Sequence, residues 1–137
     1  MAYWLAKTEP ESYSYDDLER LGRDRWNGVK NFTALKHINN MKPGDLIFIY
    51  HTGKEKAIVG VAEVVSQPYP DSTETDKRFI VADVEPRYRL DRPVSLAEIK
   101  QNPVFDKWEL VRQSRLSVMP VTTEHWSLVH SIAKEIS

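Results

Sequence analysis

Asp45-Leu-Ile-Phe-Ile-Tyr-His51 and Ala57-Ile-Val-Gly-Val-Ala-Glu-Val-Val-Ser-Gln67 are two apolar runs rich in isoleucine, valine and aromatic residues. Each run predicts a buried strand. The turn Lys42-Pro-Gly-Asp45 precedes the first run, and the polar segment His51-Thr-Gly-Lys-Glu-Lys56 separates the two. A β-sheet is therefore the expected centre of the fold.

Three further strands are predicted on either side of this pair. They are Ala2–Lys7, Arg78–Arg89 and Arg115–Met119. The second of them contains Pro86, which lacks the backbone donor of a central strand and therefore indicates an edge or a bulge. The intervening segment 68–76 is predicted to be a polar loop.

Four helices are expected, each beginning at a residue whose side chain can cap the first turn. The caps are Ser14, Asn31, Ser95 and Thr123, and the helices are expected to end near Leu21, Met41, Gln101 and Ile136. The apolar positions expected to face the core are Phe32, Leu35, Ile38, Met41, Trp126, Val129, Ile132 and Ala133. The segment Phe105–Arg112 leaves strand and helix open.

Short helices among several strands indicate an α+β fold, an open or closed mixed β-barrel with peripheral helices. The length of 137 residues and the lack of repeats or linkers predict one domain over residues 1–137. No window approaches a membrane span, and Lys7 and Glu9 come too early for a signal peptide. We therefore expect a cytoplasmic protein, or a nuclear one if the source is eukaryotic.

Several classes of chemistry are disfavoured by composition. The chain has no cysteine, which excludes disulfides, thiolate metal sites and a cysteine nucleophile. The four histidines are scattered, and no nucleophile elbow, zinc-protease, P-loop or dinucleotide motif is present. We therefore expect no metal, no cofactor and no catalytic residues.

The charge is unevenly distributed. The net charge of −1 argues against a protein that binds nucleic acid by phosphate neutralisation alone. Residues 20–42 nevertheless carry six basic side chains and one acid, whereas residues 9–19 carry five acids and no base. Such segregation suits an anionic partner, and chance variation of surface charge is the alternative.

Polar and aromatic residues stand where predicted strands give way to loops. Lys7, Thr8 and Glu9 bring together a cation, a hydroxyl and an acid, which suits reading a base edge; a surface salt bridge with a cap is the alternative. Trp26, in a polar loop, could stack on a base or plug the core beneath the loop. Tyr50 and His51 would point polar tips toward a rim, or form a structural pair.

Six segments, in order and spanning essentially the whole chain, resemble the EVE domain family of the PUA-like superfamily. They are Tyr3-Trp-Leu-Ala-Lys-Thr-Glu-Pro10, Arg25-Trp-Asn-Gly-Val-Lys-Asn31, Gly44-Asp-Leu-Ile-Phe-Ile-Tyr-His51, Ile58-Val-Gly-Val-Ala-Glu-Val64, Pro93-Val-Ser-Leu-Ala-Glu-Ile-Lys100 and Ser114-Arg-Leu-Ser-Val-Met-Pro-Val121. The resemblance implies a PUA-like mixed β-barrel flanked by short helices. It also implies a reader of modified bases in DNA or RNA, with methylated or hydroxymethylated cytosine as the ligand class.

The resemblance further implies which residues form the pocket. These are Lys7, Thr8, Glu9, Trp26, Asn27, Gly28, Val29, Asn31, Tyr50, His51, Arg115, Leu116 and Ser117. The expected phosphate ligands are Arg23, Arg25, Lys30 and Arg112. Thr8 replaces the usual serine and narrows the pocket, while Lys30 replaces the usual arginine and loses its bidentate fork.

In the expected mechanism, a base is flipped out of the helix, Trp26 stacks on it or walls the pocket, and Thr8, Glu9 and Asn31 read its polar edge. Two alternatives stay open. One is a module that binds a small metabolite or a protein partner. The other is a small amide hydrolase or ribonuclease that uses Lys7, Thr8 and Glu9. The favoured partner is nucleic acid carrying a modified base, bound by a monomer, with no membrane involved.

Overall fold

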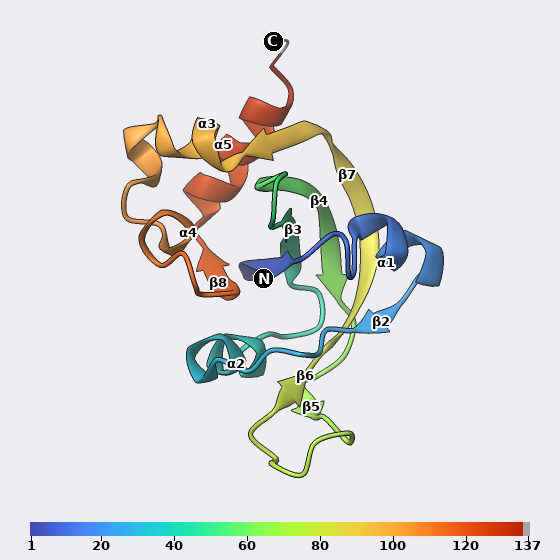
Figure 1. The fold of residues 1–137 in the computed structure, drawn as a ribbon. Coiled ribbons are helices and arrows are strands. Elements are labelled where there is room, and N and C mark those ends of the chain that lie inside the picture. Colours follow the sequence, from blue (N-terminus) through green and yellow to red (C-terminus); the bar gives the residue numbers. More distant parts are fainter. Residues whose placement is uncertain (136–137) are drawn as a thin grey trace.

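A computed structural model of the chain describes residues 1–135. Its centre is a six-stranded mixed sheet in the order β2-β7-β4-β3-β1-β8. The strands are β1 (Tyr3–Thr8), β2 (Asp24–Arg25), β3 (Leu46–His51), β4 (Ala57–Val64), β7 (Asp83–Ser95) and β8 (Val118–Val121). Only β1 and β3 pair in parallel; the other neighbours are antiparallel. The sheet curls, and the long strand β7 curves around one side of it (Figure 1).

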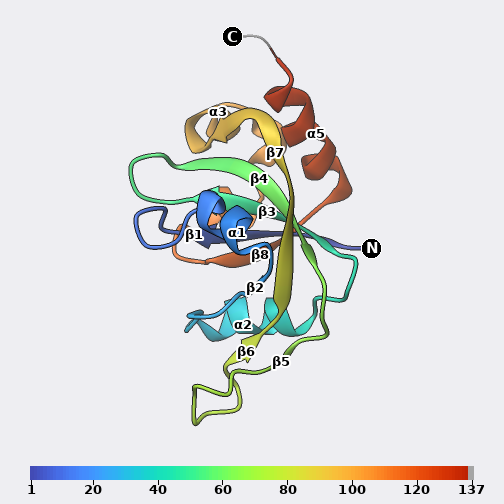
Figure 2. The same ribbon diagram turned by 90° about the vertical axis from the view of Figure 1, so that its right-hand side faces the viewer.

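Short helices cover the ends of the curled sheet. They are α1 (Tyr15–Leu21), α2 (Phe32–Asn39), α3 (Leu96–Lys100), α4 (Glu109–Arg112) and α5 (Thr123–Ala133), with a 3-10 turn, η1 (Pro103–Phe105). Figure 2 shows α3 and α5 beside one end of β7 and α2 beside the other end. A small hairpin of β5 (Tyr69–Pro70) and β6 (Ile80–Val81) extends beyond α2.

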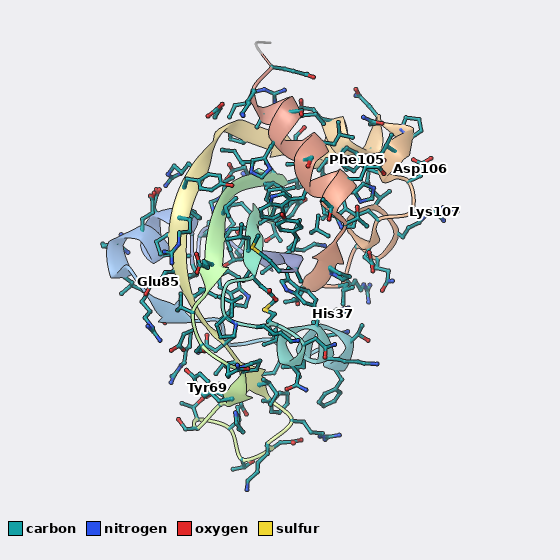
Figure 3. All side chains as sticks on the ribbon, turned by 180° about the vertical axis from the view of Figure 1, so that it is seen from behind. His37, Tyr69, Glu85, Phe105, Asp106 and Lys107 are labelled. Atoms are coloured by element: carbon teal, nitrogen blue, oxygen red, sulfur yellow. The ribbon has the colours of Figure 1, made fainter. Side chains whose placement is uncertain are left out.

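The core lies between the sheet and these helices. Five consecutive residues of β3, from Ile47 to His51, are buried, because both faces of this central strand are covered. Trp126 of α5 stacks on Phe48, with ring centroids 4.0 Å apart, and on Tyr3 at 4.3 Å. Seen from behind, Phe105 lies beside α5 (Figure 3), and its ring centroid is 5.0 Å from that of His125. These aromatic contacts fix α5 and η1 on the sheet.

The structure confirms the α+β class and the mixed, barrel-like sheet. Caps at Ser14, Asn31 and Ser95 are confirmed, since each side chain accepts a hydrogen bond from the backbone of its first turn. The irregularity at Pro86 is also confirmed, because the register of β4 and β7 shifts there. The segment 105–112, for which the sequence leaves both strand and helix open, contains the last residue of η1 and the helix α4.

Several boundaries differ from the prediction. The last helix is capped by Thr122 rather than by the adjacent Thr123, because the Thr122 side chain accepts from the His125 N–H. The expected end of this helix at Ile136 lies outside the described residues. The closing strand is Val118–Val121, because its register is set by pairing with β1. The expected strand 78–89 is divided into β6 and β7, and β5 lies within the expected loop 68–76.

Phe32 is the one predicted core residue that the structure places at the surface. It is 50% exposed, whereas Leu35, Ile38 and Met41 are buried as predicted. Its ring stacks on Phe79, which precedes β6, with centroids 5.9 Å apart. Phe32 therefore contacts the β5–β6 hairpin instead of the core.

Candidate functional site

A cleft of about 280 Å³ opens where the two edges of the curled sheet approach each other. Strand β2 is one edge strand of the sheet and β8 is the other. Residues from or next to both edges line the cleft, together with the end of β1. The lining residues are Lys7, Thr8, Tyr13, Asp24, Arg25, Trp26, Asn27, Gly28, Val29, Lys30 and Ser117. The curl of the sheet thus brings together segments that are far apart in the sequence.

Short hydrogen bonds fix these segments. The backbone N–H of Lys7 donates to the Ser117 carbonyl at 2.8 Å, and the Thr8 hydroxyl donates to the Tyr13 carbonyl at 2.6 Å. On the opposite side, the Trp26 N–H donates to the Ala82 carbonyl at 2.9 Å. The cleft is therefore shaped before any ligand arrives, which lowers the entropic cost of binding.

Trp26 forms an aromatic wall of the cleft. It is only 9% exposed and belongs to the hydrophobic core, so it is both a core residue and a lining residue. Its ring meets the edge of Tyr13, with centroids 6.2 Å apart at 80°. Gly28, two residues further on, has φ +78°, a conformation that side chains other than glycine rarely adopt. This turn carries the loop back over the cleft toward α2.

Tyr13 and Asp24 lie together in the cleft. The Tyr13 hydroxyl is buried and forms no hydrogen bond with the described residues. Burial and the nearby Asp24 carboxylate raise the pKa of Tyr13, so the phenol stays protonated at neutral pH. Asp24 Oδ1 accepts a hydrogen bond from the Arg25 backbone N–H at 2.8 Å. The site thus contains a neutral phenol next to a carboxylate.

Lys7 places a half-buried ammonium group on the other side of the cleft. Its Nζ donates to the Ser114 carbonyl at 3.0 Å and lies 5.7 Å from the centroid of the Tyr50 ring. Burial lowers the pKa of Lys7. Lys7 therefore offers the cleft hydrogen-bond donors whose charge is opposite to that of Asp24.

The structure brings nine of the predicted site residues into the cleft. They are Lys7, Thr8, Arg25, Trp26, Asn27, Gly28, Val29, Lys30 and Ser117. Tyr13 and Asp24 were not predicted. The sequence held a signal for Asp24, which stands two residues before Trp26 in the same polar segment. Tyr13 had no comparable signal, because only the fold turns it toward Trp26.

Four predicted ligand residues do not line the cleft. Glu9 Oε2 accepts from the Thr52 hydroxyl at 3.2 Å, and Asn31 Oδ1 caps α2 by accepting from the Ala34 N–H at 3.0 Å. Tyr50 and His51 are buried rather than at a rim. His51 Nε2 accepts from the Tyr15 N–H at 3.0 Å, so its Nδ1 is the atom that faces Glu55 at 2.8 Å.

A second, shallower groove of about 330 Å³ holds four of the eight remaining predicted residues. It is lined by Asn31, Thr33, Arg112, Gln113, Ser114, Arg115 and Leu116, and we call it the basic groove. It adjoins the cleft, because Lys30 and Ser117 of the cleft are the sequence neighbours of Asn31 and Leu116. Arg112 Nε donates to the Asp106 carbonyl at 2.6 Å.

Arg23, a predicted phosphate ligand, lines neither the cleft nor the basic groove. Its guanidinium is 2.9 Å from Asp83 and 3.7 Å from Glu85. Lys30, at the cleft, forms an ion pair with Glu74. Both pairs are exposed to solvent and therefore weak, so a phosphate can compete for either cation.

A curled mixed sheet with a preformed cleft between its edge strands defines the class of PUA-like half-barrel domains. In agreement, the ASCH structure from Zymomonas mobilis has the same fold at 12% identity, with a TM-score of 0.64 over 99% of each chain. Residues 2–132 match the EVE domain, and the chain belongs to this family. In the residues that the structure describes, no helix is long and apolar enough to cross a membrane.

Two solved structures illustrate this similarity. A protein from Rhodopseudomonas palustris, solved by NMR, is 40% identical, with a TM-score of 0.92 over 97% of this chain and 93% of that one. Human THYN1 protein, solved in complex with DNA containing 5-methylcytosine, is 27% identical, with a TM-score of 0.93 over 100% of both chains. Both likenesses extend over essentially the whole fold.

Proposed function

We propose that this chain is a non-catalytic reader of DNA that captures one modified cytosine, such as 5-methylcytosine, in the cleft beside Trp26. The observation that carries the proposal is the cleft itself, which combines an aromatic wall with groups of both charges in about 280 Å³. This volume is at the small end of the range for ligand pockets. The whole-chain similarity to the human protein bound to methylated DNA supports the choice of ligand.

The proposed binding sequence begins with extrusion of the base from the duplex, which costs a few kcal/mol. Stacking on an aromatic ring such as Trp26 stabilises the bound base by roughly 1–3 kcal/mol and offsets part of this cost. The polar edge of the base then meets Lys7 and Asp24, whose opposite charges match acceptors and donors. Any polar group that the base leaves unpaired lowers its affinity, and this is the physical basis of selectivity.

Basic residues around the cleft hold the DNA backbone in this proposal. Arg25 and Lys30 line the cleft, and Arg112 and Arg115 line the basic groove beside it. With a net charge of only −1 for the chain, attraction to phosphate is local to this face rather than general. A DNA reader acts where DNA is found, so we place it in the cytoplasm of a prokaryote or the nucleus of a eukaryote.

Binding rather than catalysis suits the chemistry of Lys7. A nucleophilic lysine needs a free lone pair, whereas this ammonium group donates to the Ser114 carbonyl at 3.0 Å. The acid of the hydrolase alternative, Glu9, contacts Thr52 instead of lining the cleft. These contacts support a pocket that holds its ligand unchanged.

The test is a titration of the purified chain with short duplexes carrying one cytosine, 5-methylcytosine or 5-hydroxymethylcytosine. We expect wild type to prefer a modified base by about tenfold or more, and Trp26→Ala to abolish the preference because the aromatic contact is lost. Trp26→Phe, which keeps an aromatic ring in the core, is expected to retain part of it. RNA strands of the same sequence show whether the preference is restricted to DNA.

Phe32→Ala is the matched control, since it removes an exposed ring that does not line the cleft. This variant is expected to keep the preference of wild type. Thermal melting of each variant separates a lost pocket from a lost fold. If folded Trp26→Ala still preferred the modified base, the assignment of this cleft would be wrong.

A further inference from the structure

One carboxylate has no explained role in the cleft. Among the described residues that line it, Asp24 is the only acid. Glu9, the acid expected there from the sequence, accepts from Thr52, and the expected amide of Asn31 caps α2. Asp24 is therefore the one charged acceptor that the described lining residues offer to a base edge.

Asp24 differs from the nearby Asp83 in its partners. Asp83, which pairs with Arg25 in the β2–β7 ladder, is held by the Arg23 guanidinium at 2.9 Å and the Tyr69 hydroxyl at 2.6 Å. Asp24 Oδ1 accepts the adjacent Arg25 N–H at 2.8 Å, the neutral Tyr13 hydroxyl lies close to the carboxylate, and no cation among the described residues forms an ion pair with it. Because no cation pairs with it and each carboxylate oxygen has two lone pairs, the Asp24 carboxylate can accept a further hydrogen bond from a ligand.

The proposed ligand creates a problem of discrimination that this oxygen can solve. 5-Methylcytosine and thymine carry the same methyl group at C5, so a pocket that senses the methyl alone confuses the two. They differ at position 4, where cytosine has an amino donor and thymine has a carbonyl acceptor. A carboxylate accepts from the amino group and repels the carbonyl oxygen.

We infer that Asp24 is the specificity-determining residue that admits cytosine-type bases and rejects thymine, by accepting a hydrogen bond from the exocyclic amino group. This inference rests on the proposed function and identifies the group that selects its ligand. Lys7, of opposite charge, supplies donors for the acceptor atoms of the same base edge. Thymine would place a carbonyl oxygen against the Asp24 carboxylate. The repulsion between these two acceptors lowers the affinity more than the loss of one hydrogen bond would.

Strand β2 holds Asp24 in position. The Asp24 backbone pairs with Val84 of β7, which fixes it relative to the sheet. The buried Tyr13 hydroxyl lies close to the carboxylate and stays protonated, so it repels neither the carboxylate nor its ligand.

The experiment compares 5-methylcytosine, cytosine and thymine, each placed opposite an abasic site, so that extrusion breaks no base pair. We expect wild type to bind 5-methylcytosine about tenfold or more tightly than thymine. Asp24→Asn keeps an oxygen that accepts from the Arg25 N–H, but its amide N–H can donate to the thymine carbonyl. The ratio of the affinities for 5-methylcytosine and thymine is therefore expected to fall toward one. Asp24→Ala removes the side-chain acceptor and is expected to lose the ratio as well.

Asp83→Asn is the matched control, because it removes the same charge at a neighbouring strand position outside the cleft. It is expected to keep the wild-type ratio. The inference would be overturned if wild type bound 5-methylcytosine and thymine with nearly equal affinity, or if both Asp24 variants kept the wild-type ratio of these affinities. In either case, a preference of wild type for 5-methylcytosine over cytosine would still support the proposed function. If wild type did not prefer 5-methylcytosine over cytosine, the proposed function itself would be overturned.

Discussion

Tyr15 shows how a single side chain attaches a helix to the sheet. It is 1% exposed, and its hydroxyl donates to the carbonyls of Val61 on β4 and Tyr88 on β7, at 2.8 and 3.1 Å. A Cβ at Gly60 would lie 2.8 Å from the Tyr15 ring, so glycine is required for this approach. Tyr15 thereby attaches α1 to two neighbouring strands.

Tyr15→Phe is expected to lower the free energy of unfolding by about 1–2 kcal/mol at neutral pH, because the hydroxyl hydrogen shared by the Val61 and Tyr88 carbonyls is lost. The effect depends on pH in a defined direction. Burial raises the pKa of Tyr15 from 10.0 to about 12. The contribution of the hydroxyl is therefore complete below pH 10 and is lost as the pH rises from 10 toward 12.

The measurement is urea unfolding of both proteins at several pH values between 7 and about 11.5. The stability difference between wild type and Tyr15→Phe should narrow above pH 10. A difference that stayed constant or widened there would show that the hydroxyl is not protected from ionisation in the folded state.

At the scale of elements, α2 connects the cleft to the basic groove through its cap. Asn31 ends the loop that begins at Trp26, and its side chain accepts from the Ala34 N–H at 3.0 Å. If Asn31 caps the helix, its loss should lower stability, whereas if it reads the base, its loss should lower selectivity. The observed contact favours capping, so Asn31 shapes the site indirectly by fixing where α2 begins.

Asn31→Ala is expected to lower the free energy of unfolding by about 1 kcal/mol through loss of the cap. Asn31→Asp should restore stability, since aspartate caps helices as well as asparagine does. Both variants are expected to keep the ratio of affinities for modified and plain cytosine. Thermal melting and titration check the two quantities separately, and a lost ratio with unchanged stability would instead assign Asn31 to base reading.

Strand β2 is the other element on which the site depends. It has only two residues, yet it places Asp24 and Arg25 at the cleft and joins the edge of the sheet. Its pairing with Val84 and Asp83 of β7 gives this otherwise irregular segment a fixed position. A polar loop with aromatic and charged residues thus becomes part of a rigid wall.

At the scale of the whole molecule, binding should combine a base-dependent contribution from the cleft with a salt-dependent one from the basic groove. Arg115 is exposed and forms no ion pair with the described residues. Arg115→Gln should therefore reduce the slope of log affinity against log salt by about 0.9, the value for one phosphate contact. The preference for a modified base is expected to remain.

Titration at several salt concentrations measures this slope. Lys100→Gln is the control, because it removes an equal charge from α3, at the opposite end of the sheet from α2 (Figure 1). Its slope should match that of wild type. An unchanged slope in Arg115→Gln would remove the basic groove from the DNA-binding face.

Local patterns were sufficient for most of the elements and for part of the site. The runs after Asp45 and Ala57 predicted β3 and β4, and the caps at Ser14, Asn31 and Ser95 predicted helix starts, because both signals depend on neighbouring residues. Where two neighbours were equivalent, as at Thr122 and Thr123, the local signal could not choose between them.

The sequence by itself determined the class of fold and the family, and it predicted site residues in the segments Lys7–Thr8, Arg25–Lys30 and Ser117. Only the tertiary structure decided which side chains meet there. It placed Tyr13 and Asp24 in the cleft and assigned Glu9, Asn31 and His51 to structural contacts. The reason is physical: the cleft forms where the sheet curls until its edge strands approach, and curvature arises from long-range pairing that no local pattern encodes.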